Sequence, residues 1–189
     1  MASNPAEAVD PVAELKNLGA EITSNEQGAI SVNLALQGNG TSIDAELVHL
    51  KALEDRLGKL ESLNLGIALI TDAGLVHLKD LTNLQVLYLP NQITDAGLVP
   101  LAGMNLKTLN IPKEAKTDSG LKHYLAAAKS PTTLRLNSWN VTDAGLVHLK
   151  DLTNLDHLYL EGTYLPGTQV TDAGIAKPQQ ALPKCTIHR

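Results

Sequence analysis

Residues 71–84 read TDAGLVHLKDLTNL, and residues 142–155 repeat the same letters without a change. The opening TDAGL returns at residues 94–98, close variants stand at 117–121 and 171–175, and a degenerate copy stands at 43–47. The first residues of successive copies from 71 onward lie 23 to 29 residues apart. This periodicity predicts a protein built from stacked units, each of which buries its apolar face against the next.

Each unit combines two hydrophobic periods. Leu75, Leu78 and Leu81 recur at a helical spacing of three residues. A Leu-x-x-Leu-x-Leu pattern follows, and its last part alternates as a short strand does. Six stretches fit this pattern, some of them weakly: residues 60–65, 84–89, 106–111, 134–136, 155–160 and 182–187.

The pentapeptide and the leucine pattern recur in register over about residues 42–189, and together they resemble the leucine-rich-repeat family. The Thr-Asp-Ala-Gly-Leu form is similar to a short bacterial class of that family. The resemblance implies an α/β fold: a right-handed leucine-rich-repeat solenoid over residues 41–189, with about five to six coils, a parallel concave sheet and convex helices. The chain departs from the family pattern in lacking a regular asparagine after the strand, in an insertion at residues 164–168, and in Pro178 within the last helix.

The pentapeptide also has a local physical explanation. Threonine is a good helix N-cap, and the following aspartate favours the positive end of the helix dipole. Ile70 and Leu75 occupy the two positions of a hydrophobic staple, which most copies preserve and Lys116 interrupts. Glycine is otherwise a poor helix residue, so Gly74 and its equivalents predict a close approach between neighbouring units.

The two ends of the chain differ from the repeats. Residues 1–9 are expected to be a flexible N-terminus, and residues 10–40 an N-terminal cap made of a helix and a hairpin. The helix should begin at Asp10-Pro11, and the hairpin should turn at residues 25–28. At the other end, Pro183 and Lys184 favour a blunted strand edge, although pairing of that edge with a second copy is the alternative. A monomer is therefore expected rather than a dimer.

Composition limits the classes of function. The formal net charge of −5 argues against broad phosphate binding, including nucleic acid, because that needs a basic face. No apolar stretch approaches the roughly 20 residues of a membrane span, so a soluble protein is expected. The first ten residues lack the pattern of a signal peptide, which leaves the localisation open, since a longer precursor could carry one.

The residues that could carry chemistry favour structural roles. No phosphate-binding loop, His-Glu-x-x-His motif or cysteine pair is present, so no enzyme activity, cofactor or metal is expected. Cys185 fits an inward position of a strand. The aspartate that recurs in each unit is explained better by helix capping than by calcium, and a recurring histidine on the helices is expected on their outer face.

The predicted binding surface is the concave face of the sheet, where residues between the inward leucines face solvent. One outward column should run through Asn64, Tyr88, Asn110, Arg135, Tyr159 and Thr186. The column beside it should run through Ser62, Val86, Thr108, Thr133, His157 and Lys184. Tyrosine and arginine are enriched at interface hot spots. The predicted binding residues are Tyr88, Tyr159, Asn110, Arg135, His157, Thr108 and Asn64, with Trp139 and Tyr164 as a second site in the loops.

We therefore expect a non-enzymatic interaction module that binds a protein partner of unknown identity through its concave sheet. A carbohydrate or small-ligand binding protein is the alternative, and a passive structural spacer is a third hypothesis.

Overall fold

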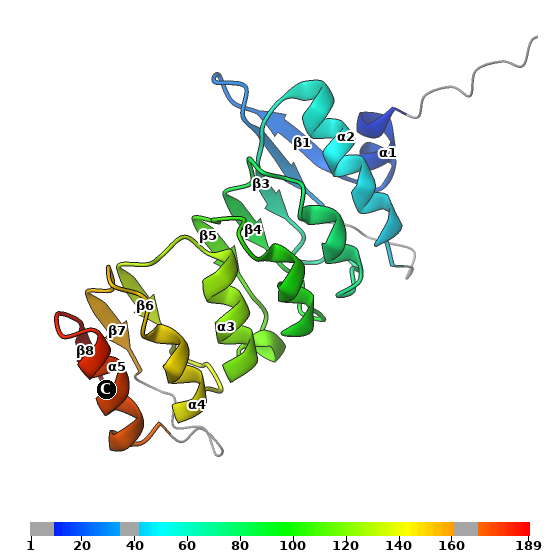
Figure 1. The fold of residues 1–189 in the computed structure, drawn as a ribbon. Helices are drawn as coiled ribbons and strands as arrows, with labels where there is room; N and C mark the ends of the chain where they lie inside the picture. Colours follow the sequence, from blue (N-terminus) through cyan, green and yellow to red (C-terminus); the bar gives the residue numbers. More distant parts are fainter. Residues whose placement is uncertain (1–9, 35–41, 161–169) are drawn as a thin grey trace, which may run out of the picture.

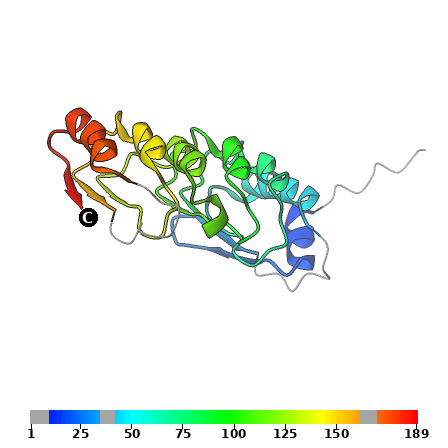
Figure 2. The same cartoon turned by 90° about the horizontal axis from the view of Figure 1, so that it is seen from below.

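The computed structural model describes residues 10–34, 42–160 and 170–189, and its helices lie in one row beside a row of strands (Figure 1). Seen at right angles, most of the helices form one layer and the strands another, whereas the first helix, in dark blue, lies below the helix layer (Figure 2). The α-helices are α1 (Pro11–Asn17), α2 (Val48–Leu57), α3 (Asp118–Ala127), α4 (Asp143–Leu146) and α5 (Asp172–Ala181). The 3₁₀ helices are η1 (Ala45–Leu47), η2 (Gly74–Leu78), η3 (Ala96–Leu101), η4 (Lys113–Ala115) and η5 (Val147–Leu149). The strands are β1 (Glu21–Ser24), β2 (Ile30–Asn33), β3 (Leu60–Asn64), β4 (Val86–Tyr88), β5 (Thr108–Asn110), β6 (Thr133–Arg135), β7 (His157–Tyr159) and β8 (Thr186–His188).

The strands form two sheets, which corrects the predicted fold. One sheet has five strands in the order β1-β2-β3-β4-β5, and the other has three in the order β6-β7-β8. The first sheet is mixed, because β1 and β2 are antiparallel while β2 to β5 run parallel. The prediction of a regular leucine-rich-repeat solenoid with one parallel concave sheet is therefore wrong in two respects: the sheet is mixed, and it is interrupted between β5 and β6.

The antiparallel pair comes from the N-terminal hairpin. The side chain of Asp10 accepts a hydrogen bond from the N–H of Val12, which begins α1 with Pro11 in its first turn. In the hairpin turn, the Asn25 side chain accepts from the N–H groups of Gln27 and Ala29. Strand β2 then pairs in parallel with β3. The hairpin thus extends the sheet of the repeats instead of standing apart from it.

Leucine fills the interior, as the repeat pattern predicts. Leu75, Leu78, Leu87 and Leu158 have no exposed surface, and they belong to one continuous core. Tyr88, between two inward leucines, is 38% exposed. The alternation along the strands therefore separates an apolar core from a polar and aromatic face.

A ladder of aspartate and threonine joins successive units. The carboxylate of Asp118 accepts from the N–H of Thr142 at 2.7 Å and from its hydroxyl at 2.6 Å. The same two hydrogen bonds join Asp44 to Thr71, Asp72 to Thr94 and Asp143 to Thr171. Each aspartate thus binds the threonine that opens the next unit, a role that the interpretation as a cap of its own helix missed.

The glycine of the pentapeptide makes room for this ladder. A Cβ atom on Gly145 would lie 2.2 Å from Oδ1 of Asp118, and one on Gly74 would lie 2.3 Å from Oδ1 of Asp44. Real Cβ atoms do not approach other atoms this closely, so any side chain at these positions would push the aspartate away. The predicted close approach between units is confirmed, and the atom approached is the aspartate oxygen.

The ladder is weakest at the step between the pentapeptides at residues 94–98 and 117–121. Asp95 accepts a hydrogen bond from the hydroxyl of Thr117 at 3.0 Å. Among the described residues, no second hydrogen bond runs from the N–H of Thr117 to Asp95. Gly120 in that unit lies against the backbone carbonyl of Ala115 instead of the preceding aspartate. The sheet is interrupted at the same step, so both interactions between units loosen together.

Candidate functional site

A cavity of about 510 Å³ lies where the sheet is interrupted. Residues of β5, of β6 and of the segments that follow them line it: Leu109, Asn110, Ile111, Lys116, Tyr124, Thr133, Leu134, Arg135 and Trp139. The volume falls in the range of small binding pockets. The cavity thus occupies the place where a continuous sheet would have had its ladder of hydrogen bonds.

Lys116 provides a physical reason for the interruption. The equivalent positions before other pentapeptides hold Ile70, Ile93 and Val141, which are fully buried. A lysine ammonium cannot be buried there without a large desolvation cost. Lys116 remains partly exposed and lines the cavity. The strands on the two sides of this position therefore do not pair, although α3 still packs against η3 of the preceding unit.

The two strand edges at the cavity lack ladder partners. Within the described residues, no hydrogen bond joins β5 to β6, and the units meet instead at bridges between Leu106 and Ala128 and between Thr117 and Asn140. The carbonyl of Asn110 accepts from β4, and that of Thr132 accepts from β7. Because successive peptide groups alternate in direction, those of Leu109 and of Thr133 face the cavity.

Two aromatic rings form one wall of the cavity. Tyr124 of α3 and Trp139 meet edge to face, with 5.5 Å between ring centroids and 76° between planes. Burial raises the pKa of the Tyr124 phenol. Trp139 is only 5% exposed and belongs to the core, so the predicted loop residue is in fact a structural wall.

Cationic and aromatic side chains continue across the three-stranded sheet. The guanidinium carbon of Arg135 lies 4.1 Å from the ring centroid of Tyr159. His188 stacks on the same ring at 4.2 Å with 6° between planes. Nδ1 of His157 lies 3.2 Å from Nε2 of His188, within hydrogen-bonding distance. The described residues give the Arg135 guanidinium no hydrogen-bond acceptor, so its donors remain available.

The structure brings some of the predicted residues together. Asn110, Arg135 and Trp139 line the cavity, and Thr108 lies on the same strand as Asn110. Asn64 and Tyr88 pair in register with Asn110 across the five-stranded sheet. His157 and Tyr159 lie on β7, beside Arg135. Tyr164 lies outside the described residues.

Three residues of the cavity and of the adjoining three-stranded sheet were not among the predicted site residues. Lys116 could have been found, because among the pentapeptides from residue 71 onward it alone interrupts the apolar position before the pentapeptide. Tyr124 gave no signal in the repeat pattern. His188 was missed through an error of register, since the prediction placed Thr186 beside Tyr159, whereas Thr186 pairs with His157 and His188 with Tyr159.

Two features are absent from the described part of the chain, and its one cysteine is buried. No three His, Cys, Asp or Glu side chains gather there closely enough to hold a metal ion. None of the helices described there combines the length and apolar character needed to cross a membrane. Cys185 is buried, and burial is the main cause of the raised pKa of its thiol.

Comparisons with known proteins add no further assignment: no protein-family model matches this chain, and no curated protein is significantly similar to it in sequence.

Proposed function

We propose that this protein is a non-enzymatic interaction module that binds a protein partner on its strand face, at the interruption between β5 and β6. The observation that carries the proposal is the cavity at the interruption, where two strand edges without ladder partners lie beside Arg135.

The chemistry of the cavity favours a peptide segment as the occupant. Unpaired main-chain groups along a strand edge bind the main chain of an added segment, as in β-augmentation. Arginine forms strong paired hydrogen bonds with a carboxylate, and Arg135 has these donors available. The partner segment should therefore present an acidic side chain to Arg135 and Lys116.

A carbohydrate ligand has less support. Proteins bind sugars by hydrogen bonds to the hydroxyl groups and by stacking an exposed aromatic ring on the sugar face, and the second contribution is missing here. Tyr159 lies on the middle strand, with Arg135 on one side and His188 on the other, so both faces of its ring are covered. Trp139 is buried. Of the described tyrosines on the strand face, Tyr88 retains the most exposure, and it lies outside the cavity.

The resemblance of the repeat motif to the leucine-rich-repeat family is consistent with this proposal, because binding of proteins is common in that family. It is an argument by analogy and says nothing about the partner's identity.

The test begins with an immobilised protein and a partner captured from cell extract, purified and measured by calorimetry. Arg135→Ala should raise the dissociation constant at least tenfold, as the loss of an interface hot spot does. Lys150→Ala removes the same charge from the helix layer and should leave the affinity within twofold. A second variant, Tyr88→Ala with Tyr159→Ala, tests whether the footprint covers both sheets.

Equal affinities of Arg135→Ala and Lys150→Ala would contradict the proposed site. If no protein is retained above the level of an empty resin, the function itself is contradicted and the passive spacer becomes the better hypothesis.

A further inference from the structure

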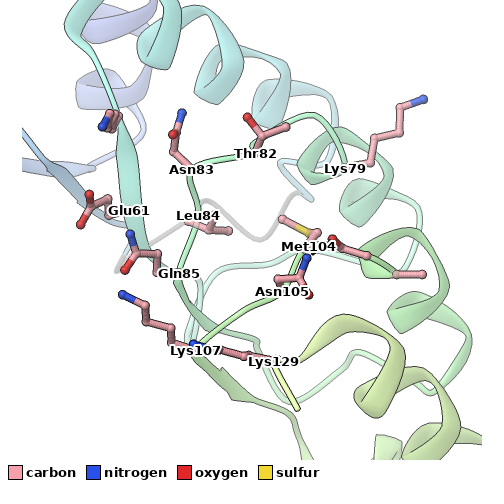
Figure 3. Close-up of a pocket in the computed structure, with 13 residues that line it drawn as sticks. Glu61, Lys79, Thr82, Asn83, Leu84, Gln85, Met104, Asn105, Lys107 and Lys129 are labelled. Carbon is pink, nitrogen blue, oxygen red and sulfur yellow. Dashed lines mark hydrogen bonds between the residues drawn. The ribbon is translucent and has the colours of Figure 1, made fainter.

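A second cavity, of about 580 Å³, lies at the edge where β3, β4 and β5 begin (Figure 3). It shares no lining residue with the cavity between β5 and β6. Its lining consists of Lys59, Glu61, Lys79, Thr82, Asn83, Leu84, Gln85, Ala102, Gly103, Met104, Asn105, Lys107 and Lys129. We refer to it as the lysine pocket.

The charge of the lysine pocket is opposite to that of the whole chain. The chain carries five more acidic than basic residues, yet four lysines and one carboxylate line this pocket. None of these lysines forms an ion pair with a described residue. Figure 3 shows Lys79 pointing away from the other labelled side chains, so Lys59, Lys107 and Lys129 carry the argument.

The stacking of units places two of these lysines next to each other. Main-chain hydrogen bonds of 2.8 Å join these units: the N–H of Gln85 donates to the carbonyl of Glu61, that of Lys107 to the carbonyl of Gln85, and that of Lys129 to the carbonyl of Leu106. The parallel bridge between Leu106 and Ala128 sets Lys107 opposite Lys129. Neighbouring strands lie about 4.8 Å apart, and like charges directly opposite each other are destabilising. Glu61 stands two units away from Lys107 and three from Lys129, so an anion from solution would relieve the repulsion.

The neutral side chains of the pocket are held in place. Nδ2 of Asn83 donates to Oε1 of Glu54 at 2.6 Å, and Glu54 is only 6% exposed. Nδ2 of Asn105 donates to the carbonyl of Gly103 at 3.1 Å, and Asn105 has a left-handed φ of 54°. Such backbone conformations are uncommon for residues other than glycine and occur often at functional sites. The pocket therefore offers two fixed amide groups beside its lysine ammonium groups.

The repeat alone does not create this pocket. The identical segment at residues 142–155 supplies Lys150, Thr153 and Asn154 at the matching positions. The position of Gln85 is taken there by Asp156, and the cavity beside it is about 200 Å³. The lysine pocket results from Lys59, Lys107 and Lys129, which the repeat does not specify.

We propose that the lysine pocket binds a small molecule carrying two or more phosphate groups, with Lys107 and Lys129 contacting one phosphate and Lys59 another. Lysine binds phosphate as a compact point charge, and the volume suits a small ligand more than a nucleic acid. The fixed amides and Thr82 then contact the polar remainder of the ligand. This inference does not depend on partner binding at the other cavity.

Titration calorimetry of the full chain with tripolyphosphate, at low ionic strength, tests the proposal. Saturable binding with one site is expected, and added salt should weaken it. The double variant Lys107→Gln with Lys129→Gln should raise the dissociation constant for tripolyphosphate at least tenfold. The matched control, Lys150→Gln with Lys184→Gln, removes the same net charge and should change the dissociation constant less than twofold.

Circular dichroism should show that both double variants keep the fold. Absence of saturable binding to the unmodified protein would overturn the proposal, as would an equal loss in the control pair. Citrate serves as a carboxylate comparison, and binding of citrate as tight as that of tripolyphosphate would overturn the assignment to phosphate.

Discussion

Residues 71–84 and 142–155 have identical sequences, and the structure shows what such a segment determines alone and what its neighbours determine. In both copies the first threonine binds the aspartate of the preceding unit. Three of the four leucines are buried in both copies, whereas Leu81 is buried and its counterpart Leu152 is only partly buried. The helices differ, because Gly74–Leu78 is a single 3₁₀ helix whereas the second copy begins with the α-helix Asp143–Leu146. The local sequence therefore fixes the path of the chain and its buried face, while contacts with adjacent units adjust the helix type.

The surroundings of the polar residues differ more between the two copies than those of the leucines. Asn83 donates to the buried carboxylate of Glu54, whereas Asn154 is exposed. The same amino acid in the same segment is structural in one copy and solvated in the other. Substitutions made in both copies can separate these two contributions.

The largest loss of stability should come from replacing the glycine of the pentapeptide, which has the same role in both copies. Gly74→Ala and Gly145→Ala should each lower the free energy of unfolding by about 2–3 kcal/mol, because the new methyl group displaces the aspartate of the ladder. Urea unfolding of each variant measures the loss. Val76→Ala and Val147→Ala, at exposed positions of the same copies, should stay within about 0.5 kcal/mol. A glycine variant as stable as these controls would contradict the role given to the close approach.

An intermediate effect should separate the copies. Asn83→Ala should cost about 2 kcal/mol, because it leaves the buried Glu54 carboxylate without its closest donor. Asn154→Ala should cost less than about 0.5 kcal/mol. A double-mutant cycle with Glu54→Gln measures the coupling directly. Equal costs for the two asparagines would mean that the neighbours do not set their roles.

The smallest effect concerns acid stability in the second copy. Hydrogen bonds from the hydroxyl and then the N–H of Thr171 lower the pKa of Asp143 below its ordinary value of 3.8. A carboxyl whose pKa is lower in the folded state stabilises the protein above its unfolded pKa and loses that contribution as the pH falls through the folded value. The melting temperature of Asp143→Asn should therefore fall less between pH 6 and pH 2, by about 2 °C, than that of the unmodified protein.

The comparison for this variant is Asp151→Asn, in the same copy, whose carboxylate has no hydrogen-bond partner among the described residues. Its melting curve should follow that of the unmodified protein across the same pH range. If both variants follow it, the ladder bond at Asp143 makes no measurable contribution to acid stability.

Much of the local structure could be predicted from the sequence. Leu87 and Leu89 are buried and Tyr88 is exposed between them, as their alternation predicts. The helix after Asp10 and the turn at residues 25–28 also follow from capping and turn residues. These features depend on contacts within a few residues, which a single sequence contains.

The interruption of the sheet could not be predicted in the same way. It depends on how one unit packs on the next, and Lys116 was recognised only as a missing staple within its own unit. The register of β8 failed for a different reason. Leu182, Cys185 and Ile187 fit the leucine pattern, which aligns Ile187 with Leu160. The strand instead pairs Ile187 with Leu158, a shift of two residues. Because side chains alternate with a period of two, such a shift keeps the same residues facing inward and cannot be recognised from the alternation alone.

The aspartate–threonine ladder has a direction, because each unit provides an acceptor to the unit after it and donors to the unit before it. In the last described unit, Asp172 meets Arg189 at 2.7 Å in place of a following threonine. A further unit with an intact pentapeptide and an apolar residue before it can therefore follow another such unit through the same pair of hydrogen bonds. A gene encoding such a protein can change the number of its units by copying DNA, and the identity of residues 71–84 and 142–155 is the trace that such copying leaves.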